Sequence, residues 1–189
     1  MAITDTALHL TIEQLNAGLD EIRRAPEREG RVEMIVRRPN IGEREVIGEA
    51  RLDVAVGLVG DNWSTRGSRM TDDGNAHPEM QLNLMGTRAI QLIAQSKERW
   101  HVAGDQFFVD LDLSLANLPA GTRLRMGEAV IEVTPVPHRG CDKFIARFGV
   151  AAQVFVNSAV GRALNLRGIN AKVIVPGVVR AGDAIRVEP

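Results

Sequence analysis

The chain begins with a helical pattern of apolar residues and then changes to the alternation of strands. In "TIEQLNAGLDEIRRAP", apolar side chains recur on one helical face, at Ile12, Leu15, Leu19 and Ile22. Thr11 stands three residues before Gln14, the spacing of a capping box, which predicts an amphipathic helix that begins here. "RVEMIVRR" and "REVIGEARLDVAV" then alternate apolar and polar positions, and "PNIGE" between them predicts a hairpin. Residues 1–50 should therefore add a helix and a hairpin to the main fold.

Short strand patterns dominate the rest of the chain. They are "MQLNLM", "QFFVDLDLSL", two strands joined at "MGE" in "TRLRMGEAVIEVTPV", and two last strands around "RAGD" in "AKVIVPGVVRAGDAIRV". Helical patterns appear in "GTRAIQLIAQSKERW" and, as far as Gly168, in "VFVNSAVGRALNLRGI". Many short strands with few helices predict a mainly β fold of the α+β class, arranged as a barrel or a sandwich.

A polar stretch, "GDNWSTRGSRMTDDGNAHPE", occupies residues 60–79. A loop of this length inside a small domain is usually functional, and ligand binding is one such function. Arg66 and Arg69 flank a glycine that could form a backbone nest for a phosphate, although a solvated loop is the more common use of such residues. His77 could cap the entry to the next strand or point into a pocket, and the sequence favours the cap.

Composition narrows the class of protein. The chain has 189 residues, enough for one domain, with 23 basic and 24 acidic residues and a net charge of -1. This balance predicts neither a nucleic-acid nor a membrane partner, and the first residues lack the pattern of a secretory signal. A cytoplasmic location is therefore expected, and a single cysteine agrees with a reducing compartment. No P-loop or dinucleotide-binding motif is present in the sequence.

The only cysteine lies in "PVPHRGCDKFIARFG", residues 135–149. The two prolines keep the approach extended, and "DKFIARFG" could form one or two helical turns that end at Gly149. Cys141 would then lie at a helix N-terminus near several cations, a position that stabilises a thiolate. Most free cysteines are buried apolar residues, however, and from the local sequence alone that interpretation is favoured. His138 suggests a Cys-His nucleophile pair, whereas scattered histidines without ligand spacing argue against zinc.

The second half of the sequence resembles the MOSC domain, the module named after the C-terminal part of molybdenum cofactor sulfurase. The resemblance covers about residues 50–189 and consists of "GDQFFVDLDLSLANLPAGTRLRMGEAVIEVTPVPHRGCDKFIARFG" followed by "LRGINAKVIVPGVVRAGDAIRV". The cysteine segment is its most specific part. Two positions depart from the family pattern. Many relatives have proline where this chain has Gly140, and a "G-D-x-H" element where it has "GDNW".

This resemblance implies a single domain over residues 1–189, a MOSC-type β-barrel and a chemical role for Cys141. The stand-alone members suggest a small molybdoenzyme that reduces N-hydroxylated or similar small molecules, with Cys141 binding the metal of the molybdenum cofactor (molybdopterin) and electrons coming from a redox partner. Alternatively, Cys141 carries a persulfide received from a cysteine desulfurase. A third possibility is a binding module without thiol chemistry. The catalytic candidates are Cys141 and His138, and the candidates for cofactor binding are Arg66, Arg69, His77, Arg139, Asp142, Lys143 and Arg147.

Overall fold

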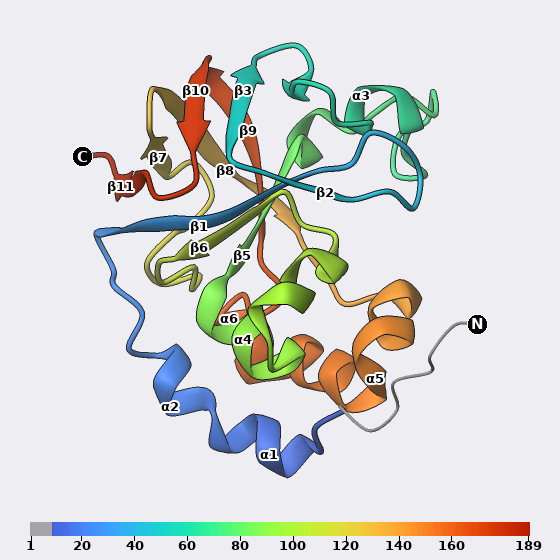
Figure 1. Ribbon diagram of the computed structural model, residues 1–189, viewed down its shortest axis with the longest axis vertical. Coiled ribbons are helices and arrows are strands. Elements are labelled where there is room, and N and C mark those ends of the chain that lie inside the picture. Colours follow the sequence, from blue (N-terminus) through green and yellow to red (C-terminus); the bar gives the residue numbers. More distant parts are fainter. Residues whose placement is uncertain (1–8) are drawn as a thin grey trace.

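A computed structural model describes residues 9–189 of the chain (Figure 1). Among these residues, seven strands form a closed barrel: β1 (Glu29–Arg37), β5 (Leu82–Gly86), β6 (Phe107–Asp110), β7 (Arg123–Met126), β8 (Ala129–Pro137), β9 (Ile169–Val175) and β11 (Ala184–Val187). The hydrogen-bonded order is β11-β7-β8-β9-β5-β6-β1, and pairing of β1 with β11 closes the barrel. The β5–β6 pair is parallel and the others are antiparallel. The predicted barrel is thus confirmed.

Shorter strands extend the barrel at one side. The predicted hairpin is confirmed, because β2 (Glu45–Ile47) pairs antiparallel with β1. A second sheet combines β3 (Glu49–Asp53), β4 (Gly57–Leu58) and β10 (Gly177–Arg180). The prediction of only two strands in the C-terminal segment is wrong. Pro176, which cannot donate a hydrogen bond to a continuous ladder, separates β9 from β10, and these two strands belong to different sheets.

Most of the helices gather at one end of the barrel (Figure 1). They are α1 (Ile12–Ala17), α2 (Leu19–Ile22), α3 (Trp63–Arg66), α4 (Thr87–Ala94), α5 (Asp142–Asn157) and α6 (Ala159–Ala163), with 3-10 turns η2 (Pro78–Met80) and η3 (Lys97–Ala103). The predicted N-terminal helix has the expected capping box at Thr11 but divides into α1 and α2 at Gly18. At Gly18 a β-carbon would lie 2.5 Å from Leu92, so the chain packs closely on α4 there.

Neighbouring residues of the barrel strands enter two different cores. Phe107 belongs to the cluster inside the barrel, and Phe108 belongs to the cluster between the barrel and the helices. Leu84 and Met85 divide in the same way. Successive side chains of a strand point to opposite faces, so a strand with helices outside it is apolar on both. The second core holds the helices against the end of the barrel where the site described below lies.

Candidate functional site

Cys141 is exposed and occupies the N-cap position of α5. Its interpretation as a buried apolar residue is therefore wrong. The helical turns that begin at Asp142 are interrupted at Gly149, where φ is +85° and ψ is 166°, and a second helical segment then continues to Asn157. The thiol thus lies beside the free N–H groups of a helix start, where the helix dipole favours negative charge.

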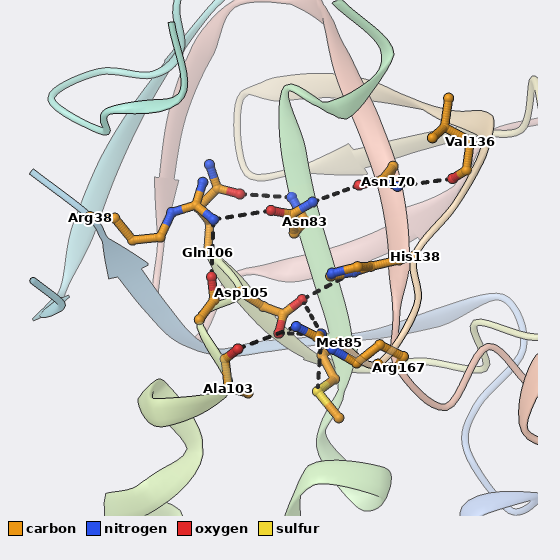
Figure 2. Close-up of polar contacts among 12 residues, drawn as sticks. Arg38, Asn83, Met85, Ala103, Asp105, Gln106, Val136, His138, Arg167 and Asn170 are labelled. Carbon is orange, nitrogen blue, oxygen red and sulfur yellow. Dashed lines mark hydrogen bonds and ion pairs between the residues drawn. The ribbon is translucent and has the colours of Figure 1, made fainter. Parts of the chain in front are cut away.

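His138 of the cysteine segment joins Asp105 and Arg167, from distant parts of the chain, in a largely buried cluster (Figure 2). Asp105, two residues before β6, is fully buried, and Nη1 of Arg167 donates to its two carboxylate oxygens at 2.9 and 2.6 Å. The second terminal nitrogen of Arg167 donates to the carbonyl of Ala103. His138 Nδ1 lies 3.4 Å from Asp105 Oδ1 and makes no hydrogen bond. The sequence-predicted His138 therefore faces a carboxylate.

Burial sets the protonation of this cluster. It raises the pKa of Asp105 above its ordinary value, and the charge and hydrogen bonds of Arg167 partly offset that rise. Burial also lowers the pKa of His138 well below 6.5, and the positive charges of Arg167 and Arg38 lower it further. His138 is consequently a neutral imidazole at neutral pH.

A second buried ion pair holds the start of the polar loop. Arg38, which follows β1, donates from two nitrogens to the carboxylate of Asp61 at 2.8 and 2.9 Å. A third nitrogen of the same guanidinium donates to Asn83 Oδ1 and to the carbonyl of Gly104. A chain of amides continues from Asn83 to Asn170 and on to the carbonyl of Val136 (Figure 2). A fully satisfied network of this kind makes the surrounding backbone rigid.

Two further guanidinium groups converge on Gly104, the residue before Asp105. A β-carbon on Gly104 would lie 3.2 Å from Arg147 Nη1 and 3.3 Å from Arg44 Nη2. Each arginine donates to a backbone carbonyl, and within residues 9–189 neither forms an ion pair with a carboxylate. Arg44 Nε is buried without a hydrogen-bond partner. The site therefore carries positive charge that the described side chains do not neutralise.

The electrostatics of these arginines point the same way. Burial lowers the pKa of Arg44, and repulsion from Arg38 adds to the effect. Burial likewise lowers the pKa of Arg147, as do the charges of Arg44 and Arg167, whereas its interactions with Cys141 and Asp105 raise it. An anion bound among these groups would relieve the repulsion. The arrangement thus suits a negatively charged ligand near the Cys141 side chain.

The other sequence-predicted residues lie around this centre. Arg66, at the end of α3, has its pKa lowered by desolvation and by repulsion from Arg38, so it belongs to the same cluster of positive charge. His77 caps η2, its Nδ1 accepting from the Glu79 N–H, which is the structural role that the sequence favoured. The remaining candidates are exposed at the surface: Arg69, Arg139, Asp142 and Lys143.

Sequence reasoning missed three buried residues of the site, Arg38, Asp105 and Arg167, and the half-buried Arg44. Of these, Asp105 and Arg167 stand in two of the blocks that carry the family resemblance, "GD" and "RG". Those blocks were the available signal, because spacing along the chain cannot show that residues 105 and 167 meet. Among the described residues, no group of three or more His, Cys, Asp or Glu side chains could hold a metal ion.

A mixed seven-stranded barrel that carries an exposed thiol beside unneutralised arginines defines the class of protein. The sequence matches the MOSC domain over residues 19–186, and the chain belongs to that family. This match reaches further toward the N-terminus than the motifs indicated, so α2 and the β1–β2 hairpin fall within the family region.

Solved structures give the same fold. The chain is similar to the YUAD protein from Bacillus subtilis, with a TM-score of 0.60 and 16% sequence identity over 84% of this chain and 95% of that one. It is also similar to YiiM from Escherichia coli, with a TM-score of 0.53 and 23% identity over 84% of this chain and 70% of that one. The comparison with curated proteins gave no match. Within residues 9–189 there is no helix with the length and apolar character needed to span a membrane.

Proposed function

We propose that the protein binds the molybdenum cofactor through the Cys141 thiolate and acts as a small reductase of N-hydroxylated or similar compounds. The observation that carries this proposal is the exposed thiol at the start of α5, which interacts electrostatically with Arg147, together with the approach of Arg147 and Arg44 to the same residue, Gly104. Membership of the MOSC family, which is associated with this cofactor in general, supports it.

The residues present fit the two ends of such a cofactor. A thiolate is a soft ligand that suits a thiophilic metal. The phosphate of the pterin would be held by Arg44 and Arg147, and the orphaned Nε atoms of Arg44 and Arg167 are further donors in the same region. The cations nearer the surface then make an outer ring: Arg66, Arg69, Arg139 and Lys143.

The cofactor, when bound, supplies the two-electron redox chemistry. Reduction of an N-hydroxyl group to N–H takes up two electrons and two protons and releases water, so an external redox partner must supply the electrons. The protein itself contributes binding and orientation. His138 stays neutral and can exchange hydrogen bonds with a ligand without adding charge, while Asp105 and Arg167 fix the backbone around it.

Elemental analysis tests the proposal. The protein would be expressed in cells that make the cofactor, and molybdenum per chain and pterin released on denaturation would both be measured. We expect close to one of each in the native protein, with strong loss of both in Cys141→Ser and in the Arg44→Gln/Arg147→Gln double variant. Arg51→Gln, which removes the charge of an exposed arginine on β3, is the matched control and should retain both. Native protein without molybdenum would overturn the proposal.

The exposure of Cys141 also favours a second function, sulfur transfer by a persulfide on the same atom. Incubation with a cysteine desulfurase and cysteine should then add one sulfur atom to Cys141, detected by mass spectrometry and absent in Cys141→Ser. Molybdenum-free protein that accepts this sulfur is a carrier, whereas protein that accepts neither sulfur nor cofactor is a binding module without thiol chemistry.

A further inference from the structure

Strand β8 separates from its neighbour β9 just before the cysteine segment. Val133 pairs with Ala171, but the next pair is Pro137 with Ile169, so residues 134–136 face Asn170 alone. The Asn170 side chain spans the gap by donating to the carbonyl of Val136 at 2.9 Å. The Thr134 hydroxyl donates a hydrogen bond to the carbonyl of Glu79. A bulge of this size opens space that a regular ladder would close.

A cavity of about 260 Å³ occupies this space. Its walls are largely apolar and include Leu115, Leu118, Val133, Val136 and Ile169. This volume lies just below the usual range of small-molecule sites, about 300 to 1,000 Å³, and suits a compact ligand. His138 and Arg139 also line the cavity. Because His138 contacts Asp105, the cavity adjoins the Asp105 cluster, and Arg139 is two residues before Cys141 in the sequence.

The polar groups of this cavity are cationic or neutral, and no Asp or Glu is among its lining residues. Arg162 donates from Nε to the carbonyl of Asn157 at 2.7 Å, which orients the guanidinium, and its terminal nitrogens have no hydrogen-bond or ion-pair partner among residues 9–189. The side chain of Arg139 likewise makes no hydrogen bond or ion pair with residues 9–189. An apolar cavity with two unpaired guanidinium groups fits a ligand with an apolar body and one negative charge.

We propose that this cavity binds a small organic carboxylate with a compact apolar body, its carboxylate held by Arg139 and Arg162. The apolar part lies against the bulged segment of β8, and His138 forms the boundary with the buried cluster. One consequence rests on the proposed function: if the protein is a reductase, its substrates are acids. The binding itself requires no cofactor.

Three probes of one shape test the charge requirement. Benzoate, benzamide and benzamidine would be titrated into isotope-labelled protein, with chemical shifts followed by NMR. We expect benzoate to bind with a dissociation constant on the order of 1 mM or below, which corresponds to about 4 kcal/mol. Benzamide should bind at least tenfold more weakly, because it lacks the charge that strengthens hydrogen bonds to guanidinium. Benzamidine should not bind.

Variants locate the binding. Arg139→Gln and Arg162→Gln should each weaken benzoate binding severalfold, and Arg162→Lys should restore part of it because the charge is retained. Ala120→Phe, at an exposed position of the lining, should block all ligands without changing charge. Arg51→Gln is again the matched control and should bind as the native protein does.

The inference is overturned if benzoate fails to bind, if benzamide binds equally well, or if Ala120→Phe and both glutamine variants bind benzoate normally. Repeating the titration with Cys141→Ser separates it from the proposed function. Benzoate binding retained in that variant supports the cavity even if the protein proves to carry no molybdenum. Molybdenum-loaded protein that ignores benzoate rejects the cavity alone.

Discussion

Asn157 holds Gly140 through both atoms of its side-chain amide. The Gly140 N–H donates to Asn157 Oδ1 at 3.0 Å, and Asn157 Nδ2 donates to the Gly140 carbonyl at 2.9 Å. Gly140 is buried and directly precedes Cys141. The kink at Gly149 lets the second half of α5 turn back, so that its last residue reaches the residue before its N-cap. The position of the Cys141 thiol therefore depends on the far end of its own helix.

Asn157→Ala should destabilise the protein by about 1 to 3 kcal/mol, because it leaves two buried backbone groups without partners. It should also loosen Cys141, so the native variant should react with an alkylating reagent at an altered rate. Urea denaturation and alkylation kinetics would measure the two effects. Gln153→Ala is the control, since Gln153 packs against Gly140 without a hydrogen bond to it. Equal effects of both substitutions would show that the amide pair contributes nothing specific.

Gly140→Pro introduces the residue that many family members have, and here we expect it to destabilise. Proline has no N–H for Asn157 Oδ1, and a β-carbon at this position would lie 2.9 Å from Val156 Cγ2. The free energy of unfolding should again fall by about 1 to 3 kcal/mol. Gly140→Ala retains the N–H and separates the steric effect from the hydrogen bond.

A double-mutant cycle tests directly whether Gly140 and Asn157 are coupled. Combined with Asn157→Ala, the proline should cost less than the sum of the two single changes, because both remove the same hydrogen bond. Strict additivity in urea denaturation would mean that the two residues are not coupled in the way the geometry indicates.

The barrel was largely predictable because its causes are local. Apolar alternation and turn residues located most strands, including the β7–β8 pair joined at Gly127. The sequence did not show that β10 leaves the barrel for the second sheet, since β9 and β10 read as one apolar run interrupted by Pro176. Which sheet a short strand joins is decided by tertiary packing rather than by its own pattern.

The candidate site, like the fold, was predictable only where its causes are local in sequence. Prolines, a glycine and the helical turns between them placed Cys141 at a helix start, and all of these lie within fifteen residues in sequence. The cationic part of the site joins Arg44, Gly104 and Arg147, which only the closed barrel brings together. His138 was named as a partner for the thiol, yet its Nδ1 faces Asp105, a contact that no spacing reveals.

Arg167→Met should be among the most destabilising single changes in the protein. It leaves the fully buried Asp105 carboxylate without its closest cation, and breaking a buried ion pair from one side typically costs about 3 to 5 kcal/mol. The double variant Asp105→Asn/Arg167→Met removes the charge as well and should recover part of the loss. Urea denaturation of Arg167→Met, Asp105→Asn and the double variant measures the coupling. A single variant as stable as the native protein would show that the pair is not stabilised as its geometry suggests.

Stability should fall as the pH is lowered below about 6.5, and His138 is one cause. Burial first, and then the nearby arginines, lower the pKa of His138 well below 6.5 in the folded protein. In the unfolded chain the imidazole takes up a proton near its ordinary pKa, so acid favours unfolding until the folded pKa is also passed. The expected slope approaches about 1.4 kcal/mol per pH unit in that window.

His138→Gln removes this titration. The free energy of unfolding should then differ less between pH 7.5 and pH 5.5, which lie about one unit above and below the ordinary histidine pKa. Asp105 acts in the opposite sense, because its raised pKa makes the folded state bind a proton more readily as the pH falls. It is present in both proteins, so the difference between their urea-denaturation curves isolates the histidine. The same pH dependence in native protein and variant would mean that His138 takes up its proton in the folded state as readily as in the unfolded chain.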